Sequence, residues 1–208
     1  KKTRLTKACE ELSKIRQKNA AALTQKLKAA LINLNFLTVE FDIAVRPGQT
    51  ITAKGYDDVE FLISTNPGES LKPLSQVASG GELSRIMLAI KTVLAGRDEI
   101  DTLIFDEIDT GISGRTAWKV AEQLSILSGA HQVICITHLP QIAAMADVHF
   151  VIEKSSTDDM TITDIRKVAD EESLAELARL LGSDALTEAA LSNAKEMKEQ
   201  ANAFKEAR

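Results

Sequence analysis

The chain has 208 residues, 44% of them apolar, which is enough to bury a sizeable core in one or two domains. It contains no apolar run of about eighteen residues and no signal-peptide pattern, so we expect neither a membrane span nor secretion, and the cytoplasm is the default compartment. Residues 1–35 hold nine Lys or Arg against two Glu, a local charge of +7 that leaves −12 for the remainder of a chain with net charge −5. An acidic main body is an unfavourable surface for coating DNA by itself.

Residues 1–35 predict one long helix that carries a coiled-coil seam. The spacing of its seam positions alternates between three and four residues: Leu5, Ala8, Leu12, Ile15, Asn19 and Ala22, of which Asn19 is polar. The apolar stripe then shifts in phase and continues at Leu23, Leu27, Leu31 and Leu34. An ordinary amphipathic surface helix is the alternative, but the length and the basic charge favour the end of a coiled-coil arm. The basic residues themselves favour a solvated helix face over a DNA contact.

The hydrophobic period then changes from helical to alternating. Apolar residues alternate over 39–45 and again over 59–63, which predicts two antiparallel strands. Between them, Pro47-Gly48 predicts a turn, and Asn66-Pro67-Gly68 predicts the end of this block. The sequence therefore indicates a small antiparallel section.

From residue 79 onward, predicted helices alternate with short apolar strands. We expect helices at 79–94 and 114–128, buried strands at 103–105, 133–137 and 148–152, and a helical tail from Asp170. Apolar spacing in the tail predicts one amphipathic helix with Leu186, Ala190, Met197, Ala201 and Phe204 on its inner face. This order of elements predicts an α/β fold with a mainly parallel sheet flanked by helices.

Two carboxylates, Asp106 and Glu107, directly follow the apolar run 103–105. They are expected at the carboxyl edge of the sheet, where α/β proteins bind ligands. Asp106 is suited to hold Mg²⁺, directly or through water. Glu107 is then placed to orient and deprotonate a water aimed at a γ-phosphate. A solvated acidic turn would have the same sequence, so this interpretation depends on its context.

A glycine-rich helix start at Ser79-Gly80-Gly81-Glu82 supplies part of that context. Ser79 and Glu82 have the spacing of a capping box, and the two glycines leave backbone N–H groups open to an anion at a helix N-terminus. A well-capped helix that merely contains glycines is the alternative. The longer string 78–85, about twenty residues before the acidic strand, argues against it.

Two further segments follow strand ends. Asp109 begins the glycine-containing turn 109–114 and is suited to cap it or to bond across an interface. His138 follows the strand 133–137, beside the acidic one, where it could reach the same phosphate as Glu107. Cys135 lies in an apolar run and is interpreted as a buried thiol. We assign no role to the two other histidines, His131 and His149.

Along the chain, the glycine-rich helix start, the acidic pair, the turn that begins at Asp109 and the histidine after a strand follow one another in the order found in ABC-type ATPases. Four strings are more specific and resemble the RecN family of bacterial DNA-repair proteins: 55–61, 66–69, 78–85 and 137–143. That family belongs to the SMC-like branch, in which a long coiled-coil arm interrupts the ATPase head. The resemblance runs over essentially the whole chain. It implies that residues 1–36 are the end of the arm and that residues 37–208 are the carboxy-terminal lobe of an ABC-type head.

The resemblance also implies a mechanism, in which two heads sandwich two ATP molecules and their Mg²⁺. The resemblance implies that five residues contact the ATP of the partner head: Ser79, Gly80, Gly81, Glu82 and Asp109. It implies that three residues act within their own head: Asp106 on Mg²⁺, Glu107 on the attacking water and His138 on the γ-phosphate. Arg85, one helical turn further on, is expected to pair with acids or to link the nucleotide state to the arm.

The implied setting is ATP-driven DNA double-strand break repair and recombination by a homodimer on DNA, in the cytoplasm and associated with the nucleoid. The sequence contains no phosphate-binding Gly-x-x-x-x-Gly-Lys-Ser/Thr loop. In the family this loop lies in an amino-terminal lobe before the arm. Because the chain starts at Lys1 in mid-pattern, we expect a piece of a longer protein. We therefore expect the chain alone to bind ATP poorly and to hydrolyse essentially none.

Three other functions remain open on the sequence alone. A membrane-transporter ATPase subunit shares these loops, but its phosphate-binding loop would lie where the coiled-coil pattern is found here. A non-catalytic dimerisation module could use the helix 1–35, although Glu107 and His138 argue against lost catalysis. A metal-dependent phosphohydrolase could use Asp106, Asp109 and His138 within one chain.

Overall fold

The computed structural model describes residues 2–77, 79–97, 99–157, 160–182 and 186–207. The chain divides into two compact units, Lys1–Asp98 and Glu99–Arg208, and each is described by itself. Within the described ranges, no helix is both long and apolar enough to cross a membrane. The long helix packs on the strands of its own unit. The predicted boundary between arm and head at residue 36 remains a prediction.

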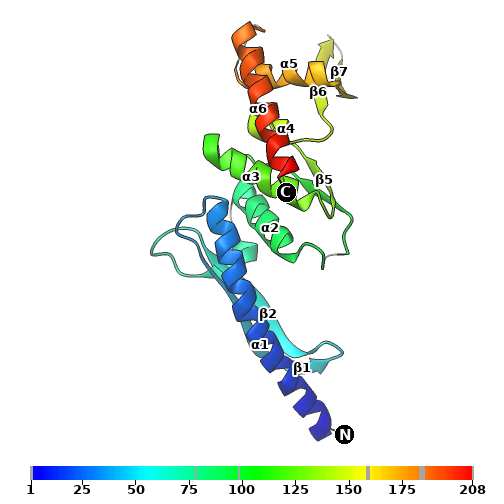
Figure 1. The fold of residues 1–208 in the computed structure, drawn as a ribbon. Coiled ribbons are helices and arrows are strands. Elements are labelled where there is room, and N and C mark those ends of the chain that lie inside the picture. Colours follow the sequence, from blue (N-terminus) through cyan, green and yellow to red (C-terminus); the bar gives the residue numbers. More distant parts are fainter. Residues whose placement is uncertain (1, 78, 98, 158–159, 183–185, 208) are drawn as a thin grey trace. The chain divides into compact units, whose positions relative to one another are not determined.

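The first unit is a long helix against an antiparallel hairpin. Its elements are α1 (Lys2–Asn33), β1 (Glu40–Thr52), β2 (Gly55–Ser64), the short β3 (Lys72–Pro73), a 3₁₀ turn (Leu74–Gln76) and α2 (Gly80–Leu94). The three strands form one sheet in the order β1-β2-β3, and every pairing is antiparallel. Figure 1 shows α1 lying along the β1–β2 hairpin. The predicted antiparallel section is therefore present.

The two apolar stripes of α1 have different surroundings. Leu27, Leu31 and Leu34 of the second stripe are at most 1% exposed, because they pack into the core of the first unit. In the first stripe, the predicted seam, Leu5 and Ile15 are exposed. An exposed apolar stripe on a long helix is the surface that a second helix covers in a coiled coil. The coiled coil itself remains a prediction.

The turn predicted at Pro47-Gly48 is wrong. Strand β1 continues through both residues to Thr52, and the chain reverses at residues 53–54. The pairing register with β2 shifts between Pro47 and Thr52, so this stretch is a bulge. A Cβ atom at Gly48 would lie 2.6 Å from the carbonyl oxygen of Tyr56, so only glycine permits this approach of the two strands.

A partly buried ion pair joins the hairpin to α1. Arg16 donates from Nη1 to Asp57 Oδ2 at 2.7 Å and from Nη2 to the carbonyl oxygen of Lys54, also at 2.7 Å. The side chain of Asp57 is inaccessible to solvent. A hydrogen bond from Ser13 and the guanidinium of Arg16 hold the pKa of Asp57 below its usual 3.8. The RecN-like string 55–61 thus holds the hairpin tip on the helix.

The second unit contains a two-stranded parallel sheet with helices and a separate hairpin. Its elements are β4 (Thr102–Phe105), α3 (Gly114–Leu127), β5 (Gln132–Cys135), α4 (Pro140–Ala144), β6 (Phe150–Thr157), β7 (Met160–Lys167), α5 (Asp170–Leu180) and α6 (Glu188–Glu206). β4 and β5 are parallel, with Phe105 opposite Cys135. The α/β fold class is confirmed, and the helices at 79–94 and 114–128 lie within a residue or two of their predicted bounds.

The third predicted strand is not part of the parallel sheet. It begins at Phe150 rather than Val148 and pairs antiparallel with β7, which the sequence patterns did not predict. The tail consists of two helices, α5 and α6. In α6, Ala190, Met197 and Ala201 are buried as expected, whereas Leu186 lies before the helix and is exposed.

Each strand of the parallel sheet has one face that is buried or half-buried and one face that is exposed. Phe105 points into the core of the second unit, whereas Ile104, Ile134 and Ile136 are 66%, 44% and 47% exposed. The prediction of fully buried strands is therefore wrong for the structure of this chain. The reason is the period of two along a strand, which puts these isoleucines on the face opposite Phe105.

Gly55→Ala is expected to lower the free energy of unfolding by about 2 kcal/mol. Gly55 has φ +94°, and an added Cβ would lie 2.9 Å from Leu12 Cδ2 and 3.1 Å from Arg16 Nη1. Gly68→Ala is the matched control, since Gly68 has φ +81° with no atom within 4 Å of its Cβ position, and should cost only about 1 kcal/mol. Urea unfolding measures both, and equal losses would contradict the close contact with α1.

Asp57→Asn is expected to destabilise the chain more at about pH 6 than at about pH 2. The folded-state pKa of Asp57 lies below 3.8, so its ionised form stabilises the fold above that pH, and this share is lost as the pH falls through the folded pKa. Asp58→Asn removes the same charge from an exposed neighbour and controls for net charge. If the gap between Asp57→Asn and the unaltered chain is the same at both pH values, the ion pair contributes nothing.

Candidate functional site

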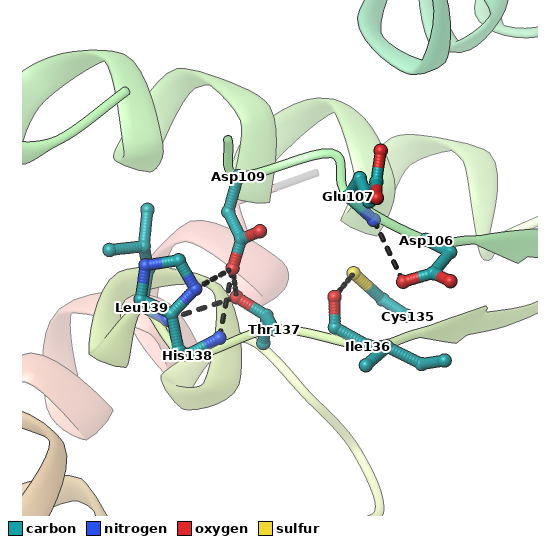
Figure 2. Close-up of polar contacts among 8 residues, drawn as sticks. All are labelled: Asp106, Glu107, Asp109, Cys135, Ile136, Thr137, His138 and Leu139. Atoms are coloured by element: carbon teal, nitrogen blue, oxygen red, sulfur yellow. Dashed lines mark hydrogen bonds and ion pairs between the residues drawn. The ribbon is translucent and has the colours of Figure 1, made fainter. Parts of the chain in front are cut away.

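The carboxyl ends of β4 and β5 lie side by side. Ile136 N–H donates to the carbonyl oxygen of Phe105 at 3.0 Å and extends the parallel ladder by one bond. The loop that begins with Asp106 and Glu107 therefore leaves the sheet next to the loop that contains Thr137 and His138 (Figure 2). Sequence spacing predicted this neighbourhood, and the structure contains it.

Asp106 and Glu107 are both exposed at this edge. The N–H of Glu107 donates to Asp106 Oδ1 at 2.9 Å. Glu107 has φ +57°, in the left-handed region that glycine prefers. A non-glycine residue in this conformation costs about 1–2 kcal/mol, and such strain is concentrated at functional sites. The backbone thus turns sharply where the expected catalytic carboxylate stands.

Asp109 points inward and is only 5% exposed. Its Oδ2 accepts from Thr137 Oγ1 at 2.6 Å and from His138 N at 2.8 Å, and it lies 3.0 Å from His138 Nδ1. Figure 2 shows these contacts converging on one carboxylate oxygen. No role was predicted for Thr137 from the sequence. Its only signal was a hydroxyl next to the histidine at a strand end.

Cys135, His131 and His149 are three further titratable residues of this unit. Burial, followed by the charges of Asp109 and Asp106, raises the pKa of the Cys135 thiol to about 12, so the thiol stays protonated. His131 Nδ1 lies 2.7 Å from the carbonyl oxygen of Ile100. His149 Nδ1 lies 2.9 Å from Ser173 Oγ, and burial lowers the pKa of this histidine. The thiol of Cys135 lies at the end of β5 beside this edge, and the two histidines have partners elsewhere in the unit.

The donor set suits a magnesium ion that is held mainly by its nucleotide. Among the described residues no group of three or more His, Cys, Asp or Glu side chains could hold a metal ion. Mg²⁺ keeps several waters and binds through one or two carboxylates plus substrate phosphates. An exposed Asp106 at the edge of the sheet fits that pattern.

The glycine-rich helix start lies in the first unit. Ser79 is the N-cap of α2, and its Oγ accepts from the N–H of Glu82 at 3.4 Å. Gly80 is exposed, whereas Gly81 is buried, and the approach of an anion to this turn remains a prediction. Ala78, which belongs to the same predicted string, lies outside the described residues.

Arg85 lies one turn further along α2 and is buried. Its guanidinium carbon is 5.7 Å from the centroid of the Phe36 ring, a cation–π distance. Phe36 follows the end of α1, so this contact joins the helix of the glycine-rich start to the base of the predicted arm. A link between Arg85 and the arm was one of the two expectations from the sequence, but its aromatic partner was not predicted.

Two solved Smc head domains have a similar fold. An Smc head domain with a coiled coil and joint from Pyrococcus yayanosii aligns with a TM-score of 0.55 over 79% of this chain and 30% of its own, at 19% identity. An Smc head domain with an extended coiled coil from Pyrococcus furiosus aligns with a TM-score of 0.51 over 83% of this chain and 41% of its own, also at 19% identity. No family model matches the sequence. At these identities, the likeness establishes the fold alone.

Sequence relatives identify the particular protein family. The DNA repair protein RecN of Halalkalibacterium halodurans is 42% identical over 93% of this chain, and that of Treponema pallidum is 45% identical over 89%. RecN of Bacillus subtilis is 48% identical over 74% of the chain. The matches cover 35%, 34% and 27% of those proteins, so the chain spans about a third of the relatives' length. The chain is a RecN homologue, and the resemblance predicted from its motifs is confirmed.

Glu107→Gly is expected to leave the chain about 1 kcal/mol more stable than Glu107→Ala. Both variants remove the carboxylate, but only glycine adopts φ near +57° without strain. Urea unfolding of the two variants measures the difference. Equal stability would show that the backbone at this position is not strained in solution.

Proposed function

We propose that this chain is the carboxy-terminal lobe of an ATP-hydrolysing, SMC-like head that acts in DNA double-strand break repair and recombination. The observation that carries the proposal is the shared edge of β4 and β5. There, two exposed carboxylates stand beside a histidine whose loop is held by a third, buried carboxylate. The RecN homology and the SMC-head fold support the same function.

Each residue at this edge has a role that its position permits. Asp106 would hold Mg²⁺, which neutralises charge on the nucleotide phosphates. Glu107, exposed on its strained turn, would orient a water and accept its proton. His138, whose side chain is 73% exposed, would contact the γ-phosphate.

The glycine-rich start of α2 would act on the ATP of a second head. Ser79, Gly80, Gly81 and Glu82 belong to the first turn of this fifteen-residue helix, where backbone N–H groups and the helix dipole favour an anion. A homodimer in which each head completes the site of the other uses this turn in trans. ATP would then bring the heads together and rearrange the arms on DNA.

The missing phosphate-binding loop would come from an amino-terminal lobe. Parallel sheets in α/β proteins are covered on both faces. Here one face leaves Ile104, Ile134 and Ile136 exposed. We assign that lobe to this face, where it would bring its loop to the edge that holds Asp106. In the same scheme residues 1–36 end the coiled-coil arm, and the protein works in the cytoplasm, associated with the nucleoid.

The chain alone is expected to release essentially no phosphate from ATP, because it lacks the loop that cradles the phosphates. Co-purification with the amino-terminal lobe of the same protein should restore turnover. In that complex, Glu107→Gln should bind ATP and accumulate as a dimer, with kcat at least about 100-fold lower, because the group that accepts the water's proton is gone.

Phosphate release and light scattering measure these two outcomes. Glu122→Gln serves as the control, since Glu122 pairs with Lys119 on the surface of α3, away from the site. Turnover by the chain alone at the rate of the complex would contradict the split site. Full activity of Glu107→Gln in the complex would contradict the role of Glu107.

A further inference from the structure

We propose that Asp109 acts inside its own chain, as the residue that positions His138 and keeps the imidazole proton on Nδ1. This inference rests on the proposed function, because it concerns the histidine assigned to the γ-phosphate. It departs from the expectation that Asp109 reaches across a head dimer. The starting point is that its carboxylate is 5% exposed and has three contacts in its own chain.

The first part of the argument concerns the backbone of the loop after β5. Asp109 Oδ2 accepts the N–H of His138 at 2.8 Å and the hydroxyl hydrogen of Thr137 at 2.6 Å. The same hydroxyl oxygen accepts from Leu139 N at 3.0 Å. Three consecutive residues are therefore tied, directly or through one hydroxyl, to a carboxylate on the neighbouring loop. Hydrogen bonds to a buried charged group are the stronger kind, so the Cα of His138 has a defined position.

The second part concerns the imidazole ring. A neutral imidazole carries one proton, on Nδ1 or on Nε2. Nδ1 lies 3.0 Å from Asp109 Oδ2, and an ionised carboxylate is an acceptor only. A bare Nδ1 would face that oxygen with its lone pair, so the proton belongs on Nδ1. Figure 2 shows the other ring nitrogen turned away from Asp109.

A fixed Nδ1–H determines what His138 offers to a ligand. The neutral ring presents the lone pair of Nε2, which accepts a proton from water, and the protonated ring presents an Nε2–H to a phosphate oxygen. In both states Nε2 is the atom that faces the reacting groups. A buried aspartate that orients a histidine in this way has the same physical role in the serine-protease triad.

The test is the tautomer of His138 in the ¹⁵N-labelled 208-residue chain, read from long-range ¹H–¹⁵N correlations at about pH 8, where histidine is neutral. The chain has only three histidines, and His138→Gln assigns the signals by loss. We expect the Nδ1–H form to exceed the Nε2–H form roughly fivefold in the unaltered chain. In Asp109→Asn that preference should disappear, because an amide N–H can donate to a bare Nδ1.

Asp106→Asn is the matched control, since it makes the same chemical change on an exposed carboxylate that accepts the N–H of Glu107, and it should leave the tautomer unchanged. A dominant Nε2–H form in the unaltered chain overturns the inference, whether or not the Asp109 variant folds. An unchanged tautomer in a folded Asp109→Asn variant also overturns it and returns Asp109 to a cross-dimer contact. Either result leaves the restored ATPase of the two-lobe complex as a separate test of the proposed function.

Discussion

The parallel pairing of β4 with β5 is the constraint on which the candidate site depends. It brings two loops that are thirty residues apart in the chain to one edge of the sheet. Strand pairing alone sets only the ends of the strands. The buried carboxylate of Asp109 then ties the second loop to the first, because a desolvated charge is tolerated only when hydrogen-bond donors surround it. Thr137 and His138 supply those donors, so the site and the stability of this edge have the same origin.

In the first unit, an ion pair likewise depends on the backbone geometry beside it. Arg16 and Asp57 hold the hairpin tip on α1, and Gly55 permits the close approach. Just beyond the carboxyl end of α1, the guanidinium of Arg85 lies over the Phe36 ring and joins α2 to the base of the helix. The helix is therefore held at two places along its length. In a SMC-like head, such contacts would carry a change at the start of α2 toward the arm.

Much of the fold could be read from the sequence, because long periodic segments and strand–helix alternation have strong local signals. The helices over 80–94 and 114–127 and the β1–β2 pairing are of this kind. The errors have physical causes. Pro47-Gly48 has the composition of a turn but forms a bulge, since pairing with β2 decides where the strand reverses. The β6–β7 hairpin was missed because apolar and polar residues alternate over only four residues, 160–163, before the pattern breaks at Asp164.

The sequence by itself determined the order of the motifs, their placement at strand ends and helix starts, and the kinship with RecN, because these depend on residue identity and spacing along the chain. It also placed Asp106, Glu107 and His138 at one edge, since parallel strands end together. Only the tertiary structure decided which way each side chain faces. Asp106 and Glu107 point to solvent, whereas Asp109, two residues later, is buried against Thr137 and His138. Spacing cannot distinguish them, because burial depends on a neighbouring loop that folds onto this one from a distant part of the chain.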